Sequence, residues 1–235
     1  MIGLADNKSN KKKRKQAKRG NLLRERLGIM DWFTSDTHFD HANIIKYSKR
    51  PFASIDEMNE KLIENINSKV KPNDRLFHLG DFAKNRVDYF RNAIKCNTVI
   101  LILGNHDRVR YNSPLFAGVY DMLTLKTQVD GQNKDIVLCH YALKVWNKSH
   151  YGSWHLYGHS HGGLPDDESA LAFDAGVDCH RYFPISIDEV KEIMDKKKWE
   201  DPRIKWQKEG TLWKPFDHHH PERKTEEAEW SPESN

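Results

Sequence analysis

The chain has 235 residues, a formal net charge of +4 and 37% hydrophobic residues, which suits one domain with a substantial core. Its longest uninterrupted apolar run covers only residues 99–103, so we expect neither a membrane span nor a signal peptide. The 3 cysteines have no CxxC spacing, which argues against a disulfide scaffold and leads us to expect a cytoplasmic protein.

The first 28 residues carry most of the positive charge. Their ten Lys or Arg and two acidic residues give this segment a charge of +8 and leave −4 for the rest. The block KKKRK at residues 11–15 has no apolar residues to bury, so we expect residues 1–29 to be a disordered arm. The arm either attracts nucleic acid or another polyanion, or is an inert solubilising extension. A third interpretation places the natural start at Met30, directly before the first predicted strand.

The body is predicted to begin with alternating strands and helices. Short apolar runs typical of buried strands lie at residues 30–35, 75–79 and 98–103. Ser54 and Glu57 form a capping box that opens a helix, whose apolar stripe continues until Pro72. A second helix is expected over residues 87–94. This alternation predicts a parallel sheet with right-handed crossovers.

The second half of the body is predicted to be richer in strands. Short strands are expected at residues 120–129, 134–139, 154–157 and 171–177. The first two flank Asp130 and Gly131, a pair typical of a β-hairpin. Ser186 and Glu189 form a second capping box in front of an apolar stripe, which predicts the last helix. Residues 199–235 are polar and punctuated by proline, so we expect a tail that is at best partly ordered.

The ends of the predicted strands carry side chains that bind metals. These residues are Asp36 with His38, Asp81, Asn105 with His106, His140, and His159 with His161. Ligands of open α/β sheets bind at the carboxyl ends of strands, so we expect the residues to converge. Asp36 and His38 are two apart and would point the same way in an extended segment. Carboxylates and imidazoles without thiolates suit Mn, Fe, Zn or Ni, and this number of ligands requires two ions.

These residues, in this order, resemble the calcineurin-like metallophosphoesterase superfamily, whose pattern DxH, GD, GNH(D/E), H, GHxH is complete here. The resemblance spans residues 30–194, and the stretches FTSDTHFDHANIIKY and SWHLYGHSHG are similar to small single-domain bacterial and phage members. It implies an α/β domain over residues 30–198, a sandwich of two mixed β-sheets flanked by helices, with a dinuclear metal site at the strand ends. The triplet DRG of phosphoprotein phosphatases does not follow Asp81, which argues against phosphoprotein substrates.

The resemblance also implies a role for each motif residue. One divalent ion would be held by Asp36, His38 and His161. The other would be held by Asn105, His140 and His159. Asp81 would bridge the two ions, Mn²⁺ being the metal we expect, and a hydroxide between them would attack phosphorus in line. His106 would protonate or stabilise the leaving oxygen, and Asp107 would orient His106 through a hydrogen bond.

Other polar and aromatic residues are candidates for contact with substrate. They are His41, Asn43, Arg50, Trp146 and His150. The first three follow the DxH motif and would either face a phosphate or be bonded locally, whereas the last two would either stack on a nucleotide base or pack beneath their loop. We interpret His78, His155 and His180 as structural, and the run DHHH at residues 217–220 as at most a scavenger of metal.

We therefore expect a divalent-metal-dependent phosphoesterase that hydrolyses a phosphodiester or phosphomonoester of a nucleotide or nucleic acid. One alternative is a binding or scaffold protein without catalysis on the same fold, like the retromer subunit that resembles this family. The complete ligand set and the histidine of GNH argue against it. The other alternative is a nucleic-acid-binding protein that acts through the arm, on which alone it rests.

Overall fold

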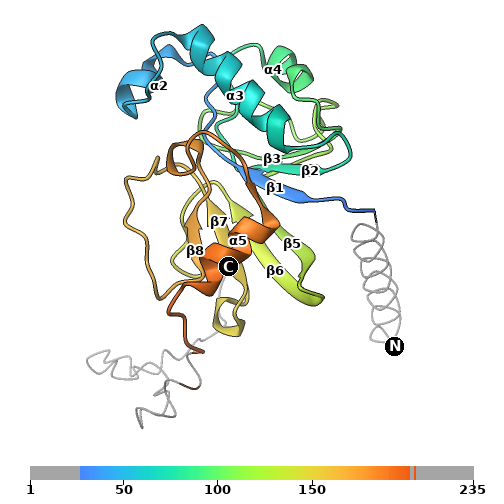
Figure 1. The fold of residues 1–235 in the computed structure, drawn as a ribbon, viewed down its shortest axis with the longest axis vertical. Helices are drawn as coiled ribbons and strands as arrows, with labels where there is room; N and C mark the ends of the chain where they lie inside the picture. The colour runs from blue at the N-terminus through green and yellow to red at the C-terminus, as the bar shows by residue number, and fades with distance from the viewer. Residues whose placement is uncertain (1–26, 202–203, 205–235) are drawn as a thin grey trace, which may run out of the picture. The chain divides into compact units, whose positions relative to one another are not determined.

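The structure is a computed structural model that describes residues 27–201 and 204 (Figure 1). The chain divides into two units, Met1–Trp199 and Glu200–Asn235, and the fold given below is that of the first. Nearly all of the predicted arm and tail, including the histidine run at residues 217–220, lies outside the described residues. Among the described residues, no helix combines the length and apolar character needed to cross a membrane.

The first sheet has the strand order β4-β3-β2-β1-β9. Its strands are β1 (Asp31–Thr34), β2 (Arg75–His78), β3 (Thr98–Ile102), β4 (Gly118–Tyr120) and β9 (Ile185–Ser186). All neighbours run parallel except β1 and β9, so the parallel pairing predicted for the first three strands is confirmed. The segments between these strands form α2 (Ala42–Tyr47), α3 (Ile55–Lys69) and α4 (Val87–Ala93). The side chain of Ser54 caps α3 by accepting a hydrogen bond from the N–H of Glu57, but the predicted capping box is not closed, because the Glu57 carboxylate accepts from the backbone N–H of Ala53 instead of Ser54.

The second sheet has the order β5-β6-β7-β8 and is also mixed. Its strands are β5 (Met122–Val129), β6 (Gln132–Cys139), β7 (Trp154–Tyr157) and β8 (Ala172–Asp174). The β5–β6 hairpin was predicted, but the strand predicted over residues 120–129 is wrong at its start, because Tyr120 belongs to the first sheet and Met122 to the second. Val177 opens the 3₁₀ turn η2 (Val177–Cys179) instead of ending a strand. The last helix, α5 (Ile187–Asp195), has the predicted capping box of Ser186 and Glu189.

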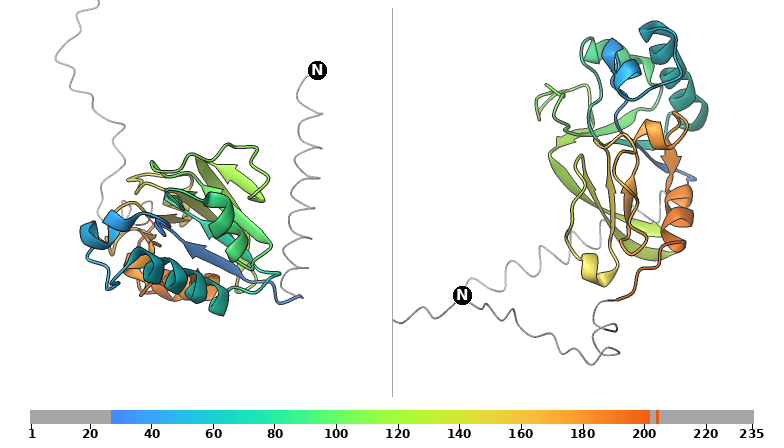
Figure 2. Two further views of the ribbon diagram at one scale, coloured as in Figure 1. Left: turned by 90° about the horizontal axis from the view of Figure 1, so that it is seen from above. Right: turned by 90° about the vertical axis from the view of Figure 1, so that its left-hand side faces the viewer.

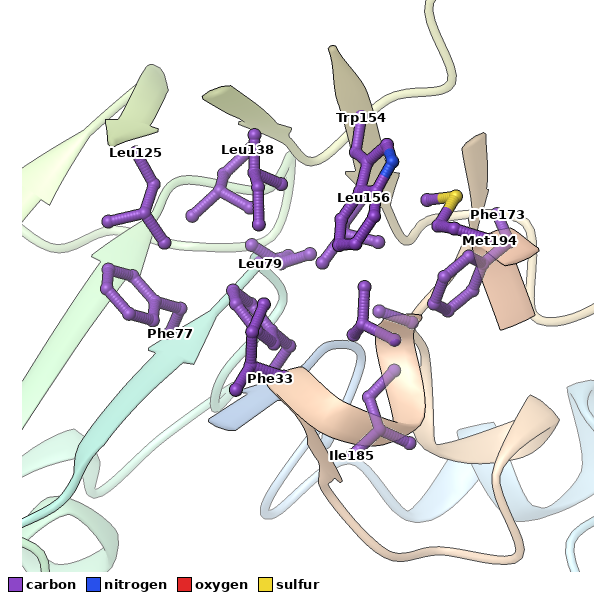
Figure 3. Packing of buried hydrophobic residues seen from close by; sticks show 14 of the residues in the cluster. Phe33, Phe77, Leu79, Leu125, Leu138, Trp154, Leu156, Phe173, Ile185 and Met194 are labelled. Carbon is purple, nitrogen blue, oxygen red and sulfur yellow. The ribbon is translucent and has the colours of Figure 1, made fainter. Parts of the chain in front are cut away.

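The first sheet lies between the second sheet on one side and α3 and α4 on the other (Figures 1 and 2). Its side chains alternate between two cores. Phe33 and Phe77 stack with ring centroids 5.4 Å apart and pack with the second sheet and α5 (Figure 3). Leu76 and Leu101, on the opposite face, pack with α3 and α4. Each fully buried side chain of this size contributes about 1.5–3 kcal/mol. The sandwich of two mixed sheets flanked by helices is therefore confirmed.

Candidate metal centre

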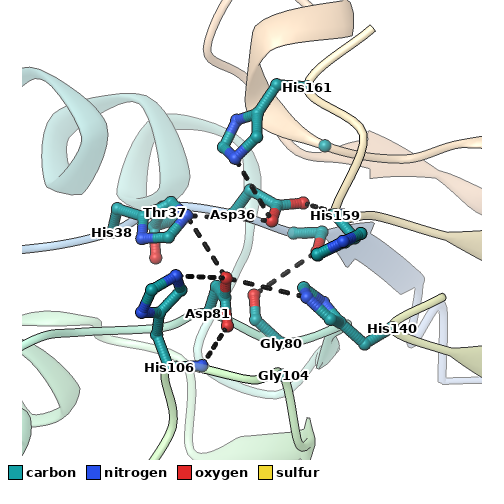
Figure 4. Close-up of polar contacts among 12 residues, drawn as sticks. Asp36, Thr37, His38, Gly80, Asp81, Gly104, His106, His140, His159 and His161 are labelled. Carbon is teal, nitrogen blue, oxygen red and sulfur yellow. Dashed lines mark hydrogen bonds and ion pairs between the residues drawn. The ribbon is translucent and has the colours of Figure 1, made fainter. Parts of the chain in front are cut away.

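The predicted ligands lie in loops that follow strands of both sheets, and their side chains converge (Figure 4). Several of these residues have left-handed backbone conformations, with φ angles of 57° at Asp36, 50° at His38, 55° at Asp81, 69° at His159 and 47° at His161. Such conformations cost about 1–3 kcal/mol each in non-glycine residues and cluster at functional sites. The extended conformation predicted for Asp36 and His38 is therefore wrong, although their side chains do converge.

The first group of ligand-type atoms comes from Asp36, His38 and His161. Asp36 Oδ1 lies 3.9 Å from His38 Nε2 and 3.9 Å from His161 Nε2. Among the described residues, Asp36 Oδ1 and His38 Nε2 are buried without a hydrogen-bond partner. Burial raises the pKa of Asp36 to about 7, against the opposing effect of His161, and burial lowers the pKa of His38 to about 2. Buried polar atoms nearly always have a partner, and a cation between these atoms would supply one.

The second group comes from Asp81, His140 and His159, and Asn105 lies beside it. His140 Nδ1 donates a hydrogen bond to the carbonyl oxygen of Leu79 at 2.8 Å, which leaves the lone pair of Nε2 free. Asn105 Oδ1 lies 3.1 Å from this nitrogen. Two acceptor atoms therefore face each other, as the ligands of one cation do.

Asp81 lies between the two groups. Its Oδ2 is 3.4 Å from His38 Nε2 and 3.6 Å from His140 Nε2, so one oxygen faces both. Its Oδ1 accepts a hydrogen bond from the backbone N–H of His106 at 2.9 Å. Asp36 is held similarly, because its Oδ2 accepts a hydrogen bond from the backbone N–H of His159, in the loop after β7, while its Oδ1 faces the ligands. Backbone donors thus orient both carboxylates.

Two glycines allow the loops to approach each other. A Cβ atom on Gly104 would lie 2.2 Å from Asp81 Oδ1, and one on Gly158 would lie 2.3 Å from Asp36 Oδ2. Neither distance is compatible with a side chain. The glycines in the motifs GNH and GHxH are therefore required for the carboxylates to occupy their positions.

Asp107 does not have the predicted position. Its carboxylate accepts hydrogen bonds from the backbone N–H groups of Gly104, Asp81 and Phe82 at 2.8–2.9 Å, and among the described residues none joins it to the His106 ring. Burial raises the pKa of Asp107, and these backbone bonds oppose the increase. Asp107 therefore joins the GD and GNH loops, which corrects the expectation that it orients His106.

Arg50 also differs from its predicted role. Its side chain is buried, and each of its five N–H groups has an acceptor: both oxygens of Asp178, the backbone carbonyls of Asp36 and Thr37, and the sulfur of Met58. No N–H group remains for a substrate phosphate. Asp178 was not predicted at all, since it lies in η2 away from every motif.

A cavity of about 660 Å³ opens beside the ligands, and its wall includes His41, Tyr47, Lys49 and His106. His41 and His106 therefore both line the cavity, and His41 is also bonded locally, since its Nδ1 lies 3.3 Å from His38 Nδ1. Three other candidates do not line this cavity. Asn43 is exposed on α2, Trp146 donates a hydrogen bond to the carbonyl of Ser153, and His150 packs against Tyr151 in the 3₁₀ turn η1 (Ser149–Tyr151).

The histidines interpreted as structural are bonded within the protein. His78 Nε2 lies 2.9 Å from Thr37 Oγ1, and because that hydroxyl donates to the Phe82 carbonyl, it accepts from the imidazole. His155 bonds the carbonyl of Val137, and His180 bonds that of Asp174. None of these rings lines the cavity.

Comparisons with known proteins agree with the motif order. A model of the calcineurin-like phosphoesterase superfamily domain matches residues 32–176. The chain is 30% identical to the uncharacterized protein MJ1445 of Methanocaldococcus jannaschii in an alignment of 183 residues that covers 71% of this chain and 92% of that protein. It is also similar to the crystal structure of the protein of unknown function AQ665 from Aquifex aeolicus, with a TM-score of 0.56 and 26% identity, over 70% of this chain and 99% of the other. The chain belongs to the calcineurin-like phosphoesterase superfamily.

Proposed function

We propose that the protein is a divalent-metal-dependent phosphoesterase whose reaction takes place beside Asp81. The observation that carries this proposal is that Asp36 Oδ1 and His38 Nε2, two of the four buried side-chain atoms without a hydrogen-bond partner among the described residues, face His161 and Asp81. Carboxylate and imidazole donors without thiolates suit first-row divalent ions. We propose Mn²⁺ as the ion, with Fe, Zn and Ni as alternatives.

The distances support two cation positions. We assign the first to Asp36, His38 and His161. We assign the second to Asn105, His140 and His159. Asp81 is the proposed bridge, because its Oδ2 lies within 3.6 Å of imidazole nitrogens from both positions. Divalent ions bound there would lower the pKa of a water molecule and neutralise the oxygens of a phosphoryl group.

His106 is the proposed general acid for the leaving oxygen. Its side chain is 54% exposed and lines the cavity, so it can reach a bound ester. Its Nε2 lies 4.0 Å from Asp81 Oδ2, close to the cation positions, and its backbone is fixed on the same carboxylate. A histidine within reach of the leaving oxygen can donate the proton that an alkoxide needs, which is typically worth ~10²–10⁴-fold in rate.

The cavity supports a substrate larger than phosphate alone, and we propose a nucleotide or nucleic acid. Its volume of about 660 Å³ is that of a site for an organic ligand. Tyr47 on its wall is 72% exposed and offers an aromatic face for a base, while Lys49 offers a positive charge for a phosphate. The cavity and these two side chains are compatible with either a phosphodiester or a phosphomonoester.

The test is a substrate screen with metal-free protein to which Mn²⁺ is added. We expect no hydrolysis without metal and hydrolysis with it, among nitrophenyl mono- and diesters, cyclic nucleotides, nucleotide monoesters, dinucleotides and short RNA or DNA. A protein that binds Mn²⁺ but hydrolyses none of these would favour the scaffold alternative.

The basic arm requires its own test, because all but its last three residues lie outside the described residues. Deletion of residues 1–28 should raise KM for an oligonucleotide and flatten its salt dependence, while kcat for a nitrophenyl ester stays unchanged. If hydrolysis of the small ester disappears with the arm, the proposed assignment of the chemistry to the folded body is wrong.

A further inference from the structure

Asp178 is a buried carboxylate that contacts His161, a proposed metal ligand, at the ring nitrogen that does not face the other ligands. It lies in η2, its side chain is 7% exposed, and its Oδ2 lies 2.6 Å from His161 Nδ1. Arg50 forks onto the same carboxylate, with Nε 2.8 Å from Oδ1 and Nη2 2.8 Å from Oδ2. Asp178 therefore accepts hydrogen bonds from two side chains that are far from it in sequence.

These contacts fix which nitrogen of His161 carries the proton. A guanidinium can only donate, and its fork onto both oxygens keeps Asp178 an ionised acceptor. His161 Nδ1 is consequently the donor in the 2.6 Å hydrogen bond. The lone pair of Nε2 then points into the ligand group, where this nitrogen lies 3.9 Å from Asp36 Oδ1.

Arg50 extends the same contact to the opposite side of the first cation position. Its Nη2 donates to the backbone carbonyl of Asp36 at 2.6 Å, and its Nη1 donates to that of Thr37 at 3.0 Å. These carbonyls lie between the two left-handed residues Asp36 and His38. The guanidinium of Arg50 therefore holds the DxH loop of the first sheet. Through Asp178 it also holds the imidazole of His161, in the loop after β7 of the second sheet.

We propose that Arg50 and Asp178 are positioning residues that act as a clamp for the first cation position, by fixing His161 in the tautomer that binds metal. This inference rests on the proposed function, because it requires the cation. The clamp is specific to one position, since His140 in the second group bonds a backbone carbonyl instead. A carboxylate behind a metal-binding imidazole raises its basicity and orients its ring, and loss of such a partner typically weakens metal affinity ~10–100-fold.

The experiment titrates metal-free protein with Mn²⁺ alone, and calorimetry measures stoichiometry and both affinities. We expect the wild type to bind two ions. Asp178→Asn should retain one ion at its original affinity and bind the other ~10–100-fold more weakly. In electron paramagnetic resonance, the signal of an isolated ion should then replace that of a coupled pair at Mn²⁺ concentrations that fill both positions of the wild type.

Asp31 provides a matched control. Arg75 forks onto it at 2.7 Å and 2.6 Å, the same geometry, at the start of β1 and away from the ligands. Asp31→Asn should lower the free energy of unfolding but leave both Mn²⁺ affinities unchanged. Arg50→Lys gives a second variant that keeps the charge but loses the fork, and it should weaken the same single ion if Asp178→Asn does not fold.

Each outcome decides between the two proposals. If the wild type binds two ions and both clamp variants bind them with wild-type affinity, the clamp is refuted and the proposed function stands. Equal weakening of both ions, or the same weakening in Asp31→Asn, would also refute the clamp, because it would reflect general destabilisation. A folded wild type that binds no Mn²⁺ would refute the metal centre itself.

Discussion

Replacement of Asp107 by alanine separates its observed role from its predicted one. The substitution removes the acceptor of three backbone N–H groups, those of Gly104, Asp81 and Phe82. Because these contacts are partly buried, we take about 1 kcal/mol for each, the lower part of the range for an unsatisfied donor. The free energy of unfolding should therefore fall by about 3 kcal/mol, a large share of the ~5–15 kcal/mol typical of a whole domain.

Urea denaturation of the metal-free protein measures this loss, with His106→Ala as the control. His106 is more than half exposed, so its truncation should leave the urea midpoint within error of the wild type. Asp107→Ala should also weaken Mn²⁺ binding, because Asp81 depends on the loop that Asp107 holds. If Asp107→Ala leaves stability and metal binding unchanged and reproduces the rate loss of His106→Ala, Asp107 does orient His106, and its assignment as the residue that joins the two loops is refuted.

Three further substitutions test other parts of the site. Asp81→Ala should lower metal occupancy at both cation positions, because its Oδ2 faces ligands of both; full occupancy by elemental analysis would contradict the bridging role. His106→Ala should keep both ions but lose rate, by up to ~10²–10⁴-fold on nucleotide esters. The loss should be smaller on nitrophenyl esters, because their nitrophenolate leaving group departs without a proton; equal losses in steady-state kinetics would contradict an acid role. Burial, and to a smaller extent His140, lower the pKa of His78 from 6.5 to about 3 in the folded protein. As the pH drops below 6.5, the unfolded chain therefore binds a proton at this residue before the folded protein does, and the free energy of unfolding falls until the pH approaches 3. At pH 5 this protonation lowers the free energy of unfolding by about 2 kcal/mol. In urea titrations at pH 7 and pH 5, His78→Gln should lose less stability between the two pH values than the wild type by that amount; an equal loss would contradict the neutral buried imidazole.

Local sequence signals predicted most of the elements and placed the candidate ligands at the strand ends. An apolar run followed by glycine and a polar ligand identifies a strand end, as at Gly80–Asp81 and Gly104–Asn105. The Asp130–Gly131 pair likewise predicted the β5–β6 hairpin. In these cases, the residues that determine the structure are neighbours in the chain.

What the sequence did not predict depends on contacts between distant residues. Arg50 and Asp178 are 128 positions apart, and neither has a local pattern that indicates the other. The boundary between β4 and β5 has the same origin, since the exposed Asp121 separates two strands whose pairing partners at this point, in different sheets, are distant in the sequence. Asp107 was misassigned because adjacency to His106 suggested a contact, whereas its hydrogen bonds go to backbone groups.

Because the proposed ligands come from both sheets, the stability of the fold should depend on the concentration of metal. Asp36, Asp81 and Asn105 follow strands of one sheet, while His140 and His159 follow strands of the other. Bound cations would therefore act as removable cross-links between the layers, and the layers could not separate without releasing them. Free Mn²⁺ at 100 times its Kd would add about 2.7 kcal/mol for each independent ion, so the melting temperature should rise with metal concentration even without substrate.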